Sequence, residues 1–276
     1  MFLKKLLHNN LAFVIAVAVI LASCQNSNKS GNAGKTSADS TNLTEISQDV
    51  KDVVYPLPTP FETTKMLNDM GAKYVSASLN PVDKADKYFT EKSKAVNLGI
   101  YGADVAYAVT YNQKQDVRLY SKAVKTLLDQ LGINVDYSNL LTDEAREKMN
   151  NKDTLINVIT NTFHNTYKNL NEKNNPDLAV MMISGMWMEL MYIATHISED
   201  TYHNSGVVKL ITNQKDSYSK LISLLSSHNT NPDIKSLETQ LLVLKPVFDK
   251  IESGLSEKDY LLILQTIQNV RNSLAA

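Results

Sequence analysis

The chain has 276 residues, and its 28 Lys and Arg residues against 29 Asp and Glu residues give a formal net charge of −1 at pH 7. A charge this close to zero gives no electrostatic basis for a nucleic-acid partner, because nucleic acids are bound mainly by basic surfaces. The chain has one cysteine, so an intrachain disulfide is excluded and the fold must be held by packing.

Residues 1–23 have the pattern of a cleavable signal peptide. Lys4 and Lys5 form a basic start, and residues 11–22 contain no charged or amide side chain. A membrane-spanning helix needs about 20 apolar residues, so this run is too short to be one, and a polar segment follows it. We therefore expect residues 1–23 to direct export and to be removed.

The end of this segment, Leu21-Ala22-Ser23-Cys24, resembles the lipobox of bacterial lipoproteins, in which the cysteine is lipidated. A lone cysteine is more often a small core residue, but its position directly after the apolar run favours lipidation of Cys24. Two or three acyl chains would hold the mature chain firmly on a membrane. Gln25 and Asn26 follow without an aspartate, which resembles sorting to the outer membrane, facing the periplasm.

The mature chain is expected to have two parts. Residues 24–52 comprise the lipidated cysteine and a flexible tether, which has no aromatic residue and too few apolar ones to form a core. As a coil of about 26 residues it would span on the order of 28 Å. Residues 53–276 form a single helical domain.

Helix starts in the domain are marked by capping residues and prolines. In Thr59-Pro60-Phe61-Glu62, an N-cap Thr precedes a Pro at the first helical position and a Glu two residues later, which predicts a first helix ending near Gly71. Three further starts are predicted by the same signals: Asn175-Pro176-Asp177, Asn231-Pro232-Asp233 and Ser256. Amphipathic spacing predicts helices over 116–131, 142–171 and 206–227, and Pro246 should kink or divide another.

Two segments, residues 95–111 and 178–196, are apolar on nearly every side, as is typical of helices buried on all faces. When they are aligned, Asp104 lies over Glu189 and Tyr107 over Tyr192. Duplication of a unit of about three helices explains this match, and so does chance similarity between buried helices. Strand signals are scarce, so we predict an all-α fold, either a multi-helix bundle or a short α-α superhelix.

Asp104 and Glu189 each lie in the middle of an apolar helix, where an ionised carboxylate is costly unless it is paired. One interpretation places both acids in an open central cleft. The favoured interpretation is a structural network, because core networks perturb acids as readily as active sites do. The residues expected to line such a cleft are Asp104, Tyr107, Tyr111, Trp187, Glu189, Tyr192 and His196.

The sequence predicts no metal and no cofactor. Neither Asp104 nor Glu189 has a histidine three residues later, as a di-iron bundle requires, and His164 and His196 lack a partner at helical spacing. No nucleophile elbow, dinucleotide fingerprint or zincin motif is present in the sequence. Five methionines surround Trp187, and such a cluster fills a core more often than it lines an adaptable pocket.

The run from Asn97 to Asp104, together with Tyr55-Pro56-Leu57-Pro58 before the first helix, resembles an uncharacterised family of exported bacterial helical lipoproteins. The resemblance covers most of the mature domain and implies export and a helical fold. That family has no established activity, so the resemblance implies no functional residue.

Function is therefore predicted by elimination. The first hypothesis is a non-catalytic envelope lipoprotein, anchored through Cys24, that binds or scaffolds another envelope protein and no nucleic acid. The alternative is an enzyme or small-molecule-binding protein that uses a central cleft with Asp104 and Glu189. A carrier of an apolar molecule would need a cavity beside Trp187.

Overall fold

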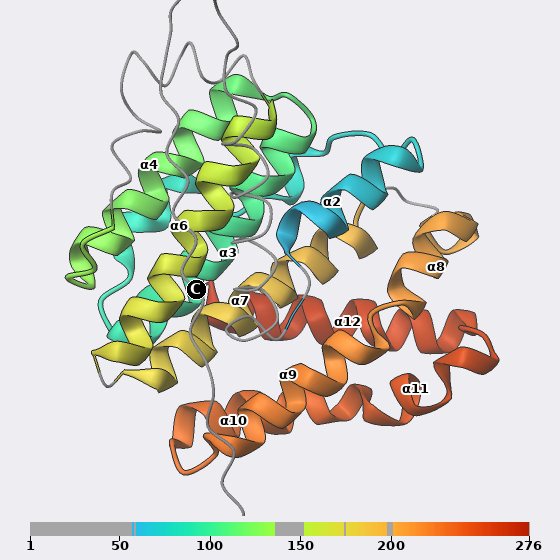
Figure 1. Cartoon of the computed structure of the whole chain (residues 1–276). Coiled ribbons are helices and arrows are strands. Elements are labelled where there is room, and N and C mark those ends of the chain that lie inside the picture. Colours follow the sequence, from blue (N-terminus) through green and yellow to red (C-terminus); the bar gives the residue numbers. More distant parts are fainter. Residues whose placement is uncertain (1–56, 58, 136–151, 174, 198–200, 276) are drawn as a thin grey trace, which may run out of the picture.

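The computed structural model describes residues 57, 59–135, 152–173, 175–197 and 201–275. The predicted signal peptide, Cys24, the tether and residues 142–151 of a predicted helix lie outside the described residues. The described part forms α-helices and short 3-10 helices without a strand, which confirms the predicted all-α multi-helix bundle (Figure 1).

Helices α3 (Glu91–Thr110) and α7 (Pro176–Thr195) form the centre of the bundle, and both are buried over most of their length. Two glycines allow a very close crossing. A Cβ atom on Gly99 would lie 1.9 Å from the carbonyl oxygen of Met182, and one on Gly185 would lie 2.1 Å from that of Val96. The two apolar segments are thus paired core helices, as their composition predicted.

Three amphipathic helices pack around this pair: α2 (Pro60–Asp69), α4 (Lys114–Gln130) and α6 (Lys152–Glu172). Helix α2 begins where the capping residues predicted, and the Glu62 carboxylate accepts the Thr59 backbone N–H at 2.8 Å. Gly71 follows this helix with a φ of 75°, the left-handed conformation that glycine adopts without strain.

The C-terminal part adds α8 (Ser205–Thr212), α9 (Lys215–Ser227), α10 (Pro232–Leu241), α11 (Lys245–Lys250) and α12 (Glu257–Leu274). The expected amphipathic segment 206–227 is two helices, because α8 packs against α2 and α7 whereas α9 packs mainly against α10. Pro246 lies in the first turn of α11 and divides the helical run, as predicted. In Figure 1, the labels of α9, α10 and α11 lie below that of α12, with α10 at the lower left and α11 at the lower right.

Short 3-10 helices complete the described chain. They are η1 (Ser76–Ser78), η2 (Val82–Lys87), η4 (Thr201–His203), η5 (Leu242–Leu244) and η6 (Ile251–Ser253). The first two belong to the connection between α2 and α3, and η2 packs against α4. This connection therefore lies against the bundle and reaches the site described below.

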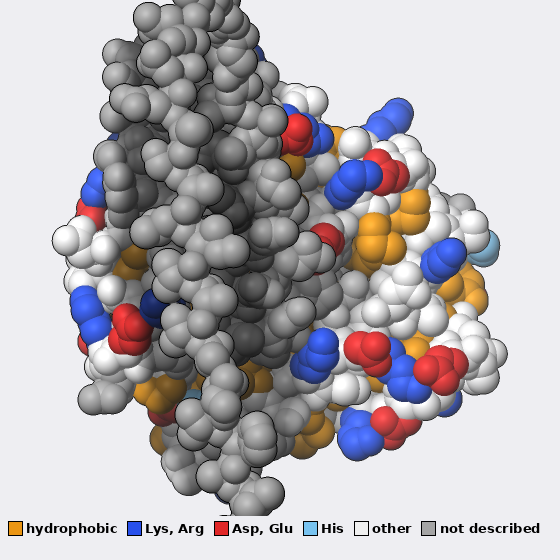
Figure 2. Space-filling view, viewed as in Figure 1, with side chains coloured by type: hydrophobic (Ala, Val, Ile, Leu, Met, Phe, Trp, Pro, Cys, Tyr) orange, Lys and Arg blue, Asp and Glu red, His pale blue; other side chains and the backbone are white. Residues whose placement is uncertain are grey.

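Among the described residues, α7 is the only helix long and apolar enough to cross a membrane, with a mean hydropathy of 1.5. Within the bundle, 89% of this helical window is buried, so its position in the core accounts for its composition. On the visible part of the surface in Figure 2, positive and negative side chains lie near one another, and hydrophobic side chains are scattered between them.

Candidate functional site

The close crossing of α3 and α7 brings Asp104 and Glu189 together in the core, where neither side chain is exposed. Helix α12 supplies a third ionisable residue, Arg271. Its Nε donates to Glu189 Oε2 at 2.5 Å, and its Nη2 donates to Glu189 Oε1 at 2.7 Å. A bidentate pair of this kind is among the strongest side-chain contacts, and it satisfies both oxygens of Glu189.

Arg271 is held from two further sides. Its Nη2 also donates to the carbonyl oxygen of Ser78 at 3.2 Å, and its guanidinium carbon lies 4.0 Å from the centre of the Tyr192 ring. Desolvated cation–π contacts of this kind are stabilising. Burial raises the pKa of Glu189, and the hydrogen bonds and charge of the Arg271 guanidinium oppose this shift, which favours the charged carboxylate.

Asp104 lies beside this ion pair and has fewer partners than Glu189. Its Oδ2 accepts the Asn80 backbone N–H at 3.2 Å, whereas its buried Oδ1 has no hydrogen-bond donor. Burial, and then the neighbouring Glu189 carboxylate, raise the pKa of Asp104 well above its ordinary value of 3.8. These shifts favour a protonated Asp104 beside the Glu189–Arg271 ion pair, and in that form Asp104 can donate to Glu189.

Further hydrogen bonds in the core involve Asn80 and Tyr88 of the α2–α3 connection and Asn97 of α3. The Asn80 amide donates to Tyr88 Oη at 3.1 Å and to Asn97 Oδ1 at 3.3 Å. The Asn97 amide in turn donates to the carbonyl oxygen of Leu274 at 2.9 Å. We call Asn80, Tyr88, Asn97, Asp104, Glu189 and Arg271 the core network. It links the connection, α3, α7 and α12.

The other residues predicted for the cleft belong to three groups. Tyr107 donates to the carbonyl oxygen of Lys73 at 3.1 Å, and its ring stacks on that of Tyr74 with centroids 4.8 Å apart. The ring of Tyr111 lies 4.8 Å from that of Tyr107, which places it in the same tyrosine group.

Tyr192 contacts Arg271 and stacks on His196 with centroids 4.0 Å apart. Burial lowers the pKa of His196, which favours the neutral imidazole. Trp187 lies in a third group, 6.0 Å from the Tyr218 ring and 6.5 Å from the Phe248 ring. The structure therefore brings together Asp104, Glu189 and, through Arg271, Tyr192.

Sequence reasoning missed Arg271, the residue that pairs with Glu189. A signal was present: Arg271 follows Ile263, Ile267 and Val270 on the buried face of α12, where a cation requires a partner. Its sequence separation of 82 residues from Glu189 hid the identity of that partner.

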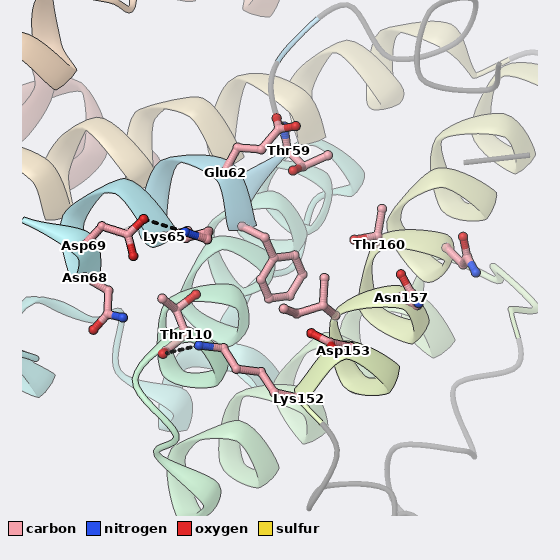
Figure 3. Close-up of a pocket in the computed structure, with 13 residues that line it drawn as sticks. Thr59, Glu62, Lys65, Asn68, Asp69, Thr110, Lys152, Asp153, Asn157 and Thr160 are labelled. Atoms are coloured by element: carbon pink, nitrogen blue, oxygen red, sulfur yellow. Dashed lines mark hydrogen bonds and ion pairs between the residues drawn. The ribbon is translucent and has the colours of Figure 1, made fainter. Parts of the chain in front are cut away.

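An open pocket of about 420 Å³ lies elsewhere, between α2, the end of α3 and the first half of α6 (Figure 3). This volume falls within the range of about 300–1,000 Å³ that is usual for small-molecule sites. Thr59, Glu62, Lys65, Asn68 and Asp69 line it from the α2 side, and Thr110 lines it from α3. Its α6 wall is formed by Lys152, Asp153, Ile156, Asn157, Thr160 and Asn161, and Phe61 adds an aromatic ring.

The charged groups of this α2–α6 pocket are largely paired. Lys65 forms an ion pair with Asp69 at 2.5 Å, and Lys152 donates to the carbonyl oxygen of Thr110 at 2.9 Å. In contrast, five polar side chains make no hydrogen bond or ion pair with the described chain: Asn68, Asp153, Asn157, Thr160 and Asn161. The pocket thus offers unused hydrogen-bonding groups, and sequence reasoning did not identify it.

No group of three His, Cys, Asp or Glu side chains able to hold a metal ion occurs among the residues that the structure describes. Searches with the whole sequence and structure found no matching protein-family model, no matching curated protein and no matching solved structure.

Proposed function

We propose that this protein is a non-catalytic, membrane-tethered binding protein of the cell envelope, which holds a small ligand in the α2–α6 pocket. The observation that carries the proposal is the contrast between its two polar sites. The core network is buried and its Glu189–Arg271 ion pair is satisfied within the core, whereas the pocket is open and has five polar side chains that make no hydrogen bond or ion pair with the described chain. Ligand sites usually combine apolar walls with a few such polar groups.

The sealed network argues against the enzyme alternative. A general acid or base must come within hydrogen-bond reach of its substrate. Asp104 and Glu189 have no exposed surface, and both Glu189 oxygens are occupied by Arg271. Pairing of Glu189 with Arg271 within the core, beside Asp104, explains why the two acids lie close together without a substrate.

The lipid anchor on Cys24 and the tether remain part of the proposal because the sequence pattern predicts them. A binding domain held by such a tether stays close to the membrane and captures its ligand there. This arrangement also suits the transfer of a ligand to another envelope protein. Such a transfer would require the contact with an envelope protein that the scaffold hypothesis includes.

Native mass spectrometry of the protein released gently from its own cell envelope tests the proposal. We expect a bound small molecule in addition to the acylated chain. Thr160→Trp should remove this mass, because the indole would fill the α6 side of the pocket. The matched control is Asn165→Trp on the same helix, at an exposed position that does not line the pocket.

Three outcomes are informative. Loss of the mass in Thr160→Trp alone supports the proposal. A mass that persists in Thr160→Trp contradicts the assignment of the pocket, because the ligand would then be bound elsewhere. A bare chain in wild type and both variants contradicts stable ligand binding.

A further inference from the structure

We propose that the ligand of the α2–α6 pocket is a neutral sugar of one or two rings. This inference rests on the proposed function, since it names the ligand class of the same pocket. Three features of the described lining support it: its lysines already have partners, several amide and hydroxyl groups do not, and apolar side chains lie among them.

The ammonium groups of the pocket are already engaged. Lys65 faces Asp69 on the next turn of α2, and Lys152 caps the end of α3 by donating to the Thr110 carbonyl oxygen, as Figure 3 shows. An anionic ligand would have to displace one of these contacts to obtain a cation. The described lining of the pocket therefore provides no preformed anion site.

The free groups are mainly neutral ones that both donate and accept. Asn157 and Asn161 lie one turn apart on α6, and Thr160 lies beside them. Across the pocket, Asn68 offers a third amide from α2. Amides and hydroxyls each supply donors and acceptors, so they match a ligand whose groups also do both.

Sugar hydroxyls have this property, and the carbon atoms of a sugar ring also present apolar faces. Phe61 and Ile156 supply the apolar part of the lining. In such a pocket, the aromatic ring and the aliphatic side chain can pack against the apolar face of the sugar, and the amides can bind its hydroxyls. Asp153 has a carboxylate without a partner among the described residues, and it can accept a sugar hydroxyl as readily as it can pair with an amine.

The experiment measures the binding of four sugars to the full chain in detergent: glucose, N-acetylglucosamine, glucosamine and glucuronate. All four have a six-membered ring and differ in their substituents. Isothermal titration calorimetry at slightly acidic pH compares two neutral rings, one cation and one anion. We expect the neutral rings to bind, with little dependence on salt, because no charge pairing is involved.

The double variant Asn157→Ala/Asn161→Ala should weaken neutral-sugar binding at least about tenfold, because two hydrogen-bonding side chains are lost. Asn165→Ala on the same helix should leave the affinity unchanged. All three asparagines are exposed, so these substitutions leave the fold intact. Asp153→Asn should weaken neutral-sugar binding less than the double variant does, because the amide oxygen still accepts a hydroxyl proton.

If glucosamine binds best and this preference is lost in Asp153→Asn, the ligand is an amine and not a neutral sugar. The proposed binding function would still stand. Preferred binding of glucuronate would likewise overturn the neutral-sugar inference. If none of the four sugars binds but Thr160→Trp still removes the ligand carried from the envelope, only the sugar inference fails. If that ligand is absent or persists in Thr160→Trp, the proposed function fails as well.

Discussion

At the scale of single residues, the raised pKa of Asp104 predicts that the stability of the fold depends on pH in an unusual direction. We expect the folded chain to keep the Asp104 proton at pH values above 3.8, its ordinary pKa, at which the unfolded chain releases it. The folded chain therefore binds more protons in this window. Its free energy of unfolding falls as the pH rises toward the raised pKa, by up to about 1.4 kcal/mol per pH unit.

Asp104→Asn should remove this dependence. The amide resembles the protonated acid: it can donate to Glu189, and its oxygen can accept the Asn80 N–H. At pH 7 the variant should be at least as stable as wild type, and the difference should shrink as the pH falls toward 4. Urea unfolding at a series of pH values measures both effects.

Arg271→Met provides the contrast, because it leaves Glu189 as a buried and unpaired charge. Breaking a buried pair in this way costs about 3–5 kcal/mol. Equal losses of stability in Asp104→Asn and Arg271→Met would contradict the assignment of Asp104 as the neutral acid.

The sequence showed that Asp104 and Glu189 need partners, because a carboxylate in an apolar helix is costly unless it is satisfied. It did not show which partners they have. That choice depends on how α3, α7 and α12 cross, and such crossings are determined by packing over the whole core. The pocket residues are harder still to foresee, because Asp153, Asn157 and Asn161 have the same sequence pattern as an ordinary solvated helix face.

At the scale of elements, the crossing of α3 and α7 depends on Gly99 and Gly185. Gly99→Ala should destabilise the protein by about 1–3 kcal/mol or more, because the new methyl group would meet the rigid backbone at Met182. This loss should exceed the small gain in helix propensity. Lys122→Ala, at an exposed position of α4, is the control and should change stability by less than about 0.5 kcal/mol. Thermal or urea unfolding that shows equal stability for both variants would refute the close contact.

Helix starts were predictable because their signals are local. Asn231 accepts the Asp233 backbone N–H at 3.0 Å, and Ser256 accepts that of Asp259 at 3.2 Å, so each cap acts within its own turn. The break between α8 and α9 was not predictable in this way. The apolar residues of segment 206–227 keep helical spacing throughout. The chain breaks between α8 and α9 because these two helices contact different neighbours.

At the scale of the whole molecule, membrane attachment is expected to depend on Cys24. Cys24→Ser should move the protein from the detergent phase to the aqueous phase in a detergent phase-separation assay, because the acyl chains supply the membrane affinity at about 0.8 kcal/mol per buried CH2 group. Metabolic labelling with a radioactive fatty acid should mark wild type and leave the variant unlabelled. A variant that remains in the detergent phase without label would show that another segment attaches the chain.

The core network also constrains the order in which the chain can fold. Its contacts join residues 193 positions apart, between Ser78 and Arg271, and Lys84 reaches the carbonyl oxygen of Ala275 across 191 positions. During synthesis, Glu189 is made 82 residues before Arg271, the cation that pairs with it. The helices around α3 and α7 can collapse early, but the buried charge stays uncompensated until α12 has emerged. Folding of this helical domain should thus be completed only at a late stage and should be slow for its class, because contacts of such long range close large loops.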